Sequence, residues 1–81
     1  MSNYFREVRY DADNDILYIR FDSVPVFSYG DEQESGVVIM RNVDTEEVTG
    51  LTVYYPKRDQ KVRESQLRKL GYFFDLSPYI S

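Results

Sequence analysis

Four aspartates near the N-terminus have the spacing that a calcium site would need. Asp11, Asp13 and Asp15 alternate along the chain, and Asp22 falls at the twelfth position of an EF-hand-type loop that would start at Asp11. Such a loop holds Ca²⁺ with oxygen ligands at alternating positions, a glycine at the sixth position and a bidentate glutamate at the twelfth. Here Ile16 takes the place of the glycine, and an aspartate takes the place of the glutamate. We therefore predict a solvated turn and no metal site.

Other catalytic chemistry lacks its usual residues. The chain contains no histidine, the side chain that titrates near neutral pH, and no cysteine that could act as a nucleophile. Paired carboxylates could still act as general acid and base, as in glycosidases. In a domain this small, however, most of the 14 acidic side chains should lie at the surface, where they cannot do that work near neutral pH. We predict that the protein is not an enzyme, has no catalytic residues and binds no cofactor.

The turn that holds these aspartates joins two expected strands. Leu17, Ile19 and Phe21 alternate with more polar residues, a period of two that is typical of a strand with one buried face. Val8 and Tyr10 continue the alternation before the turn. Asp and Asn suit the turn itself because their short side chains bond to nearby backbone amides and tolerate left-handed conformations. The pattern predicts a β-hairpin with a loop of about four to five residues.

Two further apolar segments extend the sheet. Residues 36–40 are expected to form a buried strand, and residues 48–55 a second strand. Gly50 interrupts the latter and indicates a bulge or the close approach of another backbone. Pro25 makes residues 23–28 an edge strand or a bend, and the polar residues 29–35 predict a loop. These segments together predict an antiparallel β-meander of about four to five strands.

The C-terminal part of the chain has a different composition. Residues 57–70 are rich in good helix formers, and Gly71 is placed to end a helix there. Residues 71–81 form an aromatic tail, which must pack on some surface. We predict an α+β fold in a single domain, residues 1–81: a small antiparallel β-meander at 8–55, one C-terminal helix at 57–70, and the tail at 71–81.

Charge is distributed unevenly along the chain. Residues 1–56 hold four arginines and eleven carboxylates, a balance of −7, whereas residues 57–70 hold six basic and two acidic side chains, a balance of +4. A body this acidic argues against nucleic acid as a partner, because phosphate is repelled in every orientation. The lack of cysteine favours a reducing, cytoplasmic location. No apolar run approaches the roughly 18 residues of a membrane span, and no signal-peptide pattern is present, so no membrane association is expected.

Aromatic and apolar residues in the C-terminal part make up the candidate interface. The chain has eight tyrosines and five phenylalanines, too many to bury easily in a monomer of 81 residues. Either the tail folds back over one face of the sheet, or the tail and helix pack across the two-fold axis of a homodimer. Both arrangements stay open; a stacking platform for single-stranded RNA is disfavoured by the acidic body. The candidate interface residues are Tyr54, Tyr55, Leu67, Leu70, Tyr72, Phe73, Phe74 and Tyr79.

Residues 8–55 resemble a bacterial family catalogued as domain of unknown function 2283. The resemblance lies in four segments: residues 10–19 (YDADNDILYI), residues 36–39 (GVVI), Asp44, and residues 50–53 (GLTV). The chain departs from the family pattern in the second turn, where Glu46 or Glu47 stands in place of a glycine. The resemblance implies a small sheet with a helix, and no established activity, cofactor or catalytic residue. Members of the family often lie beside genes for small ribonuclease-like toxins, which implies an antitoxin role.

The expected function is therefore a non-catalytic protein–protein binding module, forming a homodimer. In the antitoxin-like version, its acidic surface neutralises a small basic protein encoded by a neighbouring gene. The alternative is a self-associating structural protein with no other partner. A carboxylate- or metal-dependent enzyme is a third alternative, and it would need a deep pocket with at least two buried acids.

Overall fold

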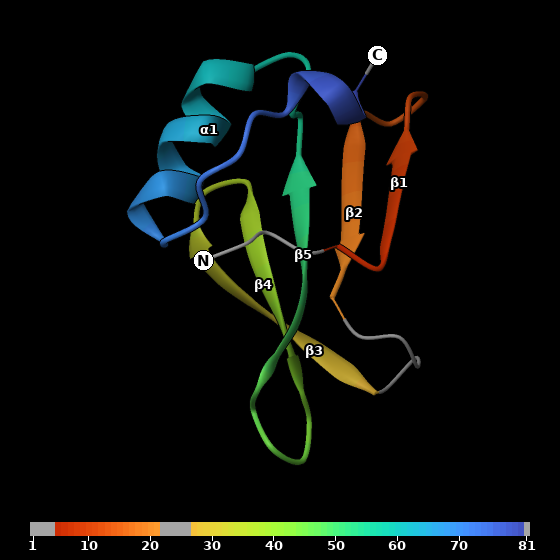
Figure 1. Ribbon diagram of the computed structural model, residues 1–81, viewed down its shortest axis with the longest axis vertical. Coiled ribbons are helices and arrows are strands. Elements are labelled where there is room, and N and C mark those ends of the chain that lie inside the picture. Colours follow the sequence, from red (N-terminus) through yellow and green to blue (C-terminus); the bar gives the residue numbers. More distant parts are fainter. Residues whose placement is uncertain (1–4, 22–26, 81) are drawn as a thin grey trace.

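A computed structural model describes residues 5–21 and 27–80 and has five antiparallel strands in one sheet (Figure 1). The α+β class with one C-terminal helix is confirmed. The interpretations of Asp22 and Pro25 concern residues that lie outside the described ranges. The elements are β1 (Glu7–Asp11), β2 (Ile16–Arg20), β3 (Ser28–Glu34), β4 (Val37–Asn42), β5 (Val48–Tyr54), the helix α1 (Gln60–Lys69) and a short 3₁₀ turn, η1 (Ser77–Tyr79).

The order of the strands across the sheet is β1-β2-β5-β4-β3. The predicted hairpin is present: β1 pairs with β2, and the turn between them spans residues 12–15, with Asp15 in a left-handed conformation (φ 54°). Strands β3, β4 and β5 form a meander, but the chain crosses from β2 to the far edge of the sheet before β3 begins. The strongly apolar β2 and β5 therefore lie side by side, and the polar β3 lies at an edge.

The loop predicted for residues 29–35 is wrong, because these residues belong to β3. Its residues pair with β4 from Ser28 to Glu34, with one irregularity between Glu32 and Glu34. Burial does not drive this pairing, since no residue of β3 is fully buried. The strand forms because its backbone completes the hydrogen bonds of β4, and charged side chains are common on such edge strands.

Gly50 fulfils both parts of its prediction. Met40 pairs with Gly50 and Arg41 pairs with Val48, so Thr49 is an extra residue that forms a bulge. A Cβ atom added at Gly50 would collide with the backbone carbonyl oxygen of Ile19. Strand β2 can therefore approach β5 this closely only because residue 50 has no side chain.

The helix begins at Gln60, three residues later than predicted, because residues 55–59 form a turn. Its C-terminal end agrees with the prediction. Gly71 has a φ of 94°, its amide donates to the Arg68 carbonyl at 3.0 Å, and the Tyr72 amide donates to the Leu67 carbonyl at 2.9 Å. These two bonds form a Schellman motif, which reverses the chain and directs the tail back over the sheet.

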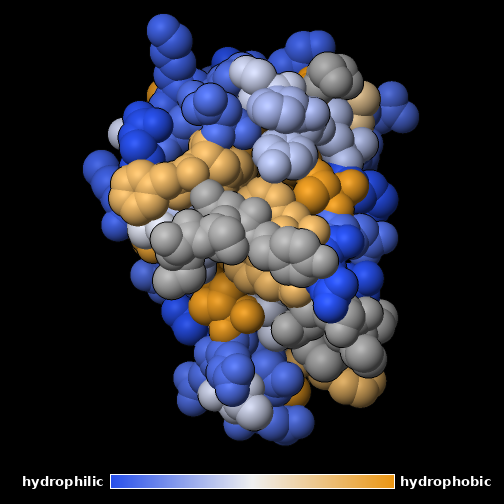
Figure 2. All heavy atoms as spheres, viewed as in Figure 1, coloured by the Kyte–Doolittle hydropathy of each residue, from blue (hydrophilic) through white to orange (hydrophobic). Residues whose placement is uncertain are grey.

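The core lies on one face of the sheet. Its strand residues are Leu17, Ile19, Val37, Ile39, Leu51 and Val53, and the helix and tail add Leu67, Leu76 and Ile80. Beside them lies an aromatic cluster in which the Phe5 ring is 5.0 Å from Phe74 and 5.7 Å from both Phe21 and Tyr79. In Figure 2 apolar surface gathers across the middle of the molecule, and hydrophilic side chains predominate at the lower end. Of the two arrangements left open by the sequence, the tail packs on the sheet of its own chain.

A nearly buried arginine fastens the helix to the sheet. Arg63 is 7% exposed, and its Nε donates to the Tyr54 carbonyl at 2.6 Å. Its Nη1 donates to Oε1 of Gln66 at 3.1 Å, and Nε2 of Gln66 donates to the Ser35 carbonyl at 2.9 Å. The guanidinium lies against Gly36, where a Cβ atom would collide with it. The helix is thus held to the end of β5 and to the β3–β4 turn by hydrogen bonds of one side-chain pair.

We expect Arg63→Ala to lower the free energy of unfolding by about 2–4 kcal/mol, because it removes several partly buried hydrogen bonds at once. Urea denaturation followed by circular dichroism measures this change. The exposed Lys61 on the same helix provides the control, and Lys61→Ala should change stability by no more than about 0.5 kcal/mol. Similar losses in the two variants would contradict the role of Arg63.

Candidate binding face

Asp11 and Asp15, at the two ends of the β1–β2 turn, make structural hydrogen bonds. The two carboxylate oxygens of Asp11 accept bonds from the backbone amide and the side-chain amide of Asn14, at 3.3 and 2.9 Å. Asp15 accepts from the Tyr10 hydroxyl at 2.8 Å and from the backbone amides of Lys57 and Arg58 at 3.1 Å each. Within residues 5–21 and 27–80, no three carboxylates gather where they could hold a metal ion.

Asp15 joins the first hairpin to the turn that precedes the helix. Desolvation by itself would raise the pKa of this carboxyl group, but the bonds from Tyr10, Arg58 and Lys57 outweigh it, so the pKa is lowered from its ordinary value of 3.8. The hydrogen bond to Asp15 in turn raises the pKa of the Tyr10 hydroxyl. The ionised form of Asp15 therefore stabilises the folded state.

We expect Asp15→Asn to lower the free energy of unfolding at neutral pH by about 1–2 kcal/mol. Asparagine tolerates the left-handed backbone, so the change tests the charge and its hydrogen bonds. Because the folded-state pKa is depressed, the stabilisation is present above the unfolded-state pKa and is lost as the pH falls through the folded-state pKa. The difference in stability between wild type and variant, measured by urea denaturation, should therefore begin to shrink below about pH 5 and should continue to shrink as the pH falls through the folded-state pKa, which lies below 3.8.

The exposed Asp13 in the same turn provides the matched control. Asp13→Asn should leave both the stability at neutral pH and its acid dependence close to those of the wild type. A constant difference between wild type and Asp15→Asn over the whole pH range would contradict the assignment.

The carboxylates that the structure describes offer no sequestered acid pair. None of the aspartates and glutamates in the described part of the chain is fully buried; Asp11, Asp15, Asp31, Glu34, Asp59 and Glu64 are half-buried, and the others are exposed. The arrangement that the enzyme alternative needs is therefore not found among these residues. The expectation that the protein is not an enzyme stays a prediction.

The sheet has a second face, which no described residue of the helix or tail covers. We call it the open face, and its central row runs across all five strands in the order Arg9, Tyr18, Thr52, Val38, Glu32. Tyr18, Thr52 and Val38 in its middle are half-buried, and Arg9 and Glu32 at its two ends are exposed. The face is thus apolar at the centre and charged at its edges, the usual anatomy of a protein interface.

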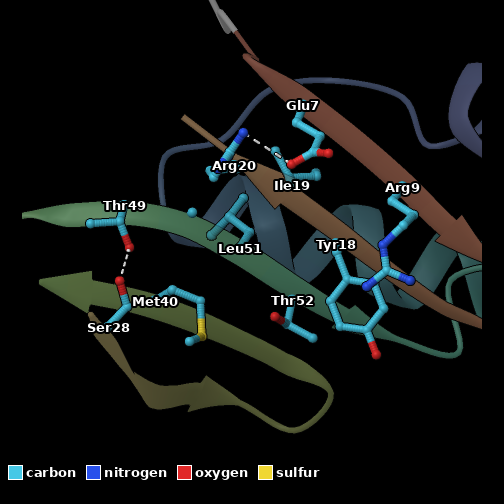
Figure 3. A pocket seen from close by; sticks show the side chains of 11 residues that line it. Glu7, Arg9, Tyr18, Ile19, Arg20, Ser28, Met40, Thr49, Leu51 and Thr52 are labelled. Carbon is cyan, nitrogen blue, oxygen red and sulfur yellow. Dashed lines mark hydrogen bonds and ion pairs between the residues drawn. The ribbon is translucent and has the colours of Figure 1, made fainter. Parts of the chain in front are cut away.

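A shallow concavity of about 250 Å³ lies on the open face, beside the central row. Gly50 is one of its lining residues, and so are the neighbours of Gly50 across the sheet, Arg20 and Met40. Because Gly50 has no side chain, the backbone forms the floor, and Figure 3 shows the surrounding side chains rising from neighbouring strands.

Two arginine side chains that line this concavity make polar contacts with their neighbours (Figure 3). Nη2 of Arg20 lies 3.1 Å from Oε1 of Glu7, while Nε of Arg20 is buried and has no acceptor among the described residues. The Arg9 guanidinium lies 4.4 Å from the centre of the Tyr18 ring. These contacts fix the orientations of both arginines on the open face.

The predicted interface residues do not form one surface. Leu67 is fully buried, and Leu70, Tyr72, Phe74 and Tyr79 pack against the core of their own chain. Phe73, Tyr54 and Tyr55 are 66%, 38% and 42% exposed, but only Tyr54 belongs to the open face. No residue of the central row is among the predicted interface residues. The sequence does carry a signal for a second apolar face, because Ile16 and Tyr18 point to the side of β2 opposite to that of Leu17 and Ile19.

Acidic residues gather at one end of the molecule. The acidic end consists of Asp44, Glu46 and Glu47 in the β4–β5 turn, with Asp31 of β3 close to them. Glu32 lies midway along β3, and Glu34 lies at the other end of the strand, beside the helix. The Tyr29 hydroxyl donates to Oε1 of Glu46 at 3.4 Å, which links the two segments. Arg41 lies 3.2 Å from Asp31 and Lys69 lies 3.9 Å from Glu34, so the other four carboxylates have no ion-pair partner among the described residues.

The chain matches no protein-family model, no curated protein and no solved structure. The resemblance to domain of unknown function 2283 therefore stays a prediction. No helix in the described part of the chain is long and apolar enough to cross a membrane.

Proposed function

We propose that the protein is a non-catalytic protein-binding module whose partner is a small basic protein, as in an antitoxin. The acidic end is the observation that carries this proposal. The β4–β5 turn, residues 43–47, contains three carboxylates and no basic side chain, a balance of −3, and the basic helix segment lies toward the opposite end of the molecule (Figure 1). Such a polarised charge distribution attracts and orients a basic partner before contact.

The edge strand β3 supplies the means of contact. It pairs with β4 on one side only, so the backbone groups of its outer side face away from the sheet. Such an edge can accept an extended segment of another protein as an additional strand. Phe27, just before β3, is 87% exposed, and it offers an apolar anchor next to the carboxylates. An extended basic segment with an apolar residue fits this edge best. A cytoplasmic location is part of the same proposal.

The test uses the small basic protein encoded by an adjacent gene, purified separately, with association measured by stopped-flow or biolayer interferometry. Asp44→Asn with Glu47→Gln removes two charges from the acidic end. We expect this pair to slow association about three- to tenfold at low ionic strength, with a smaller difference at high salt. Asp13→Asn with Asp75→Asn removes the same charge from exposed positions elsewhere and should have a smaller effect.

Two outcomes would count against the proposal. One is that no adjacent gene encodes a small basic protein that binds at low salt. The other is that the two double variants slow association equally, which would mean that net charge and not the acidic end governs binding.

A further inference from the structure

We propose that the open face binds a second copy of this chain, in a symmetric dimer whose two-fold axis runs parallel to β5. This inference concerns a different surface and a different partner from those of the proposed function, and neither depends on the other. It commits to a face-to-face arrangement of two sheets, about 10 Å apart as in β-sandwiches.

The central row of the open face carries the argument. From one edge of the sheet to the other it presents a cation (Arg9), an aromatic ring (Tyr18), a hydroxyl group (Thr52), an aliphatic side chain (Val38) and an anion (Glu32). Thr52 lies on β5, the middle strand of the five. The row therefore has opposite charges at its two ends and apolar side chains at equal distances from its centre.

A rotation of 180° about an axis along β5 exchanges the two edges of the sheet. Each Arg9 then faces Glu32 of the second copy, and each Tyr18 faces Val38 of the second copy. Thr52 faces Thr52 across the axis. In a symmetric dimer every contact occurs twice, so this one row supplies two opposite-charge pairs and two apolar contacts. If the two copies faced each other without this exchange of edges, Arg9 would face Arg9 and Glu32 would face Glu32.

The two charged residues are available for such pairs. Glu32 is exposed and has no ion-pair partner among the described residues, unlike its β3 neighbours Asp31 and Glu34. Arg9 is exposed and held over the Tyr18 ring, 4.4 Å from its centre, so its position is fixed before a partner arrives. A guanidinium placed in advance loses less side-chain entropy on binding.

The neighbouring row adds complementary shape. It contains Arg20, Gly50 and Met40 in that order across β2, β5 and β4. The same rotation places Gly50 opposite Gly50 and brings Met40 of the second copy over Arg20, at the rim of the concavity of about 250 Å³. Methionine is flexible and fills irregular apolar spaces well, so Met40 of each copy can occupy the concavity of the other.

The size of the face sets the strength of the association. Five strands about 4.8 Å apart and five residues of about 3.3 Å each give a face of about 24 by 17 Å, or about 400 Å² in plan per copy. Two such faces bury about 800 Å² in total, below the usual range for stable interfaces, so we expect a weak dimer with a dissociation constant of about 1–100 μM. The two Arg9–Glu32 pairs should contribute less to the free energy of association as salt is added.

Sedimentation equilibrium over a concentration series, from about 5 μM to about 1 mM, tests the proposal. We expect the wild type to dimerise at the upper concentrations. Arg9→Glu places a second carboxylate opposite Glu32, and Glu32→Arg places a second guanidinium opposite Arg9. Each single variant should weaken the dimer about tenfold or more at low salt, because two attractive pairs become two repulsive ones. The double variant restores opposite charges and should dimerise within about threefold of the wild type.

Mixing the two single variants gives a sharper test. The Arg9→Glu chain carries carboxylates at both edges and the Glu32→Arg chain carries guanidinium groups at both edges. A one-to-one mixture should therefore form heterodimers at concentrations where each variant alone is monomeric. Circular dichroism checks that the variants are folded. A general effect of either change on folding would not produce selective heterodimers.

Other results would overturn the inference. It fails if the wild type is monomeric up to about 1 mM, or if a dimer forms whose stability is unaffected by reversal at Arg9 and Glu32. It also fails if Phe73→Ala, on the tail, abolishes a dimer that Arg9→Glu leaves intact. Asp44→Asn with Glu47→Gln, which tests the acidic end, should leave the dimer unchanged, so failure of either proposal is recognised separately.

Discussion

The residues that follow β5 can cover only one side of a five-stranded sheet, and this constraint shapes the whole molecule. The helix covers the β3–β4 side of the core face, and the tail and η1 cover the β1 side. The Schellman motif at Gly71 makes this division possible, because it turns the chain from the helix back across the sheet. The opposite face is left to side chains of the strands themselves, and it combines half-buried apolar residues with charged residues at its edges.

The helix and hairpins are held together by a small number of polar side chains. Arg63 and Gln66 join the helix to the β3–β4 turn, and Asp15 joins the β1–β2 turn to the segment before the helix. Glu64 accepts a bond from the Leu76 amide at 2.8 Å and so fixes the tail to the helix. In a domain with a core this small, such contacts set the angle between layers, which apolar packing alone leaves poorly defined.

The local features of the fold follow from the sequence. Alternating apolar residues predict the β1–β2 hairpin, and Gly50 and Gly71 predict the bulge and the helix end, because each depends on residues close in sequence.

The loop predicted at 29–35 was wrong since β3 owes its structure to β4, and local composition carries no signal for such pairing. The candidate interface mixed core and surface residues, because apolar character alone does not distinguish Leu67, which is buried, from Phe73, which is exposed. Contacts between residues far apart in the sequence, such as the hydrogen bond from Gln66 to the Ser35 carbonyl, have no counterpart in the sequence pattern.

The character of β3 has a consequence for how large an assembly this chain can form. If two β3 strands paired edge to edge, the carboxylates of Asp31, Glu32 and Glu34 on both strands would be brought close together, and the ladder would be disfavoured. The irregularity between Glu32 and Glu34 disturbs the regular hydrogen-bonding pattern that such a ladder needs. Open-ended growth into fibrils is thereby discouraged at this edge. The same negative charge that repels another copy leaves the strand accessible to a chain of opposite charge.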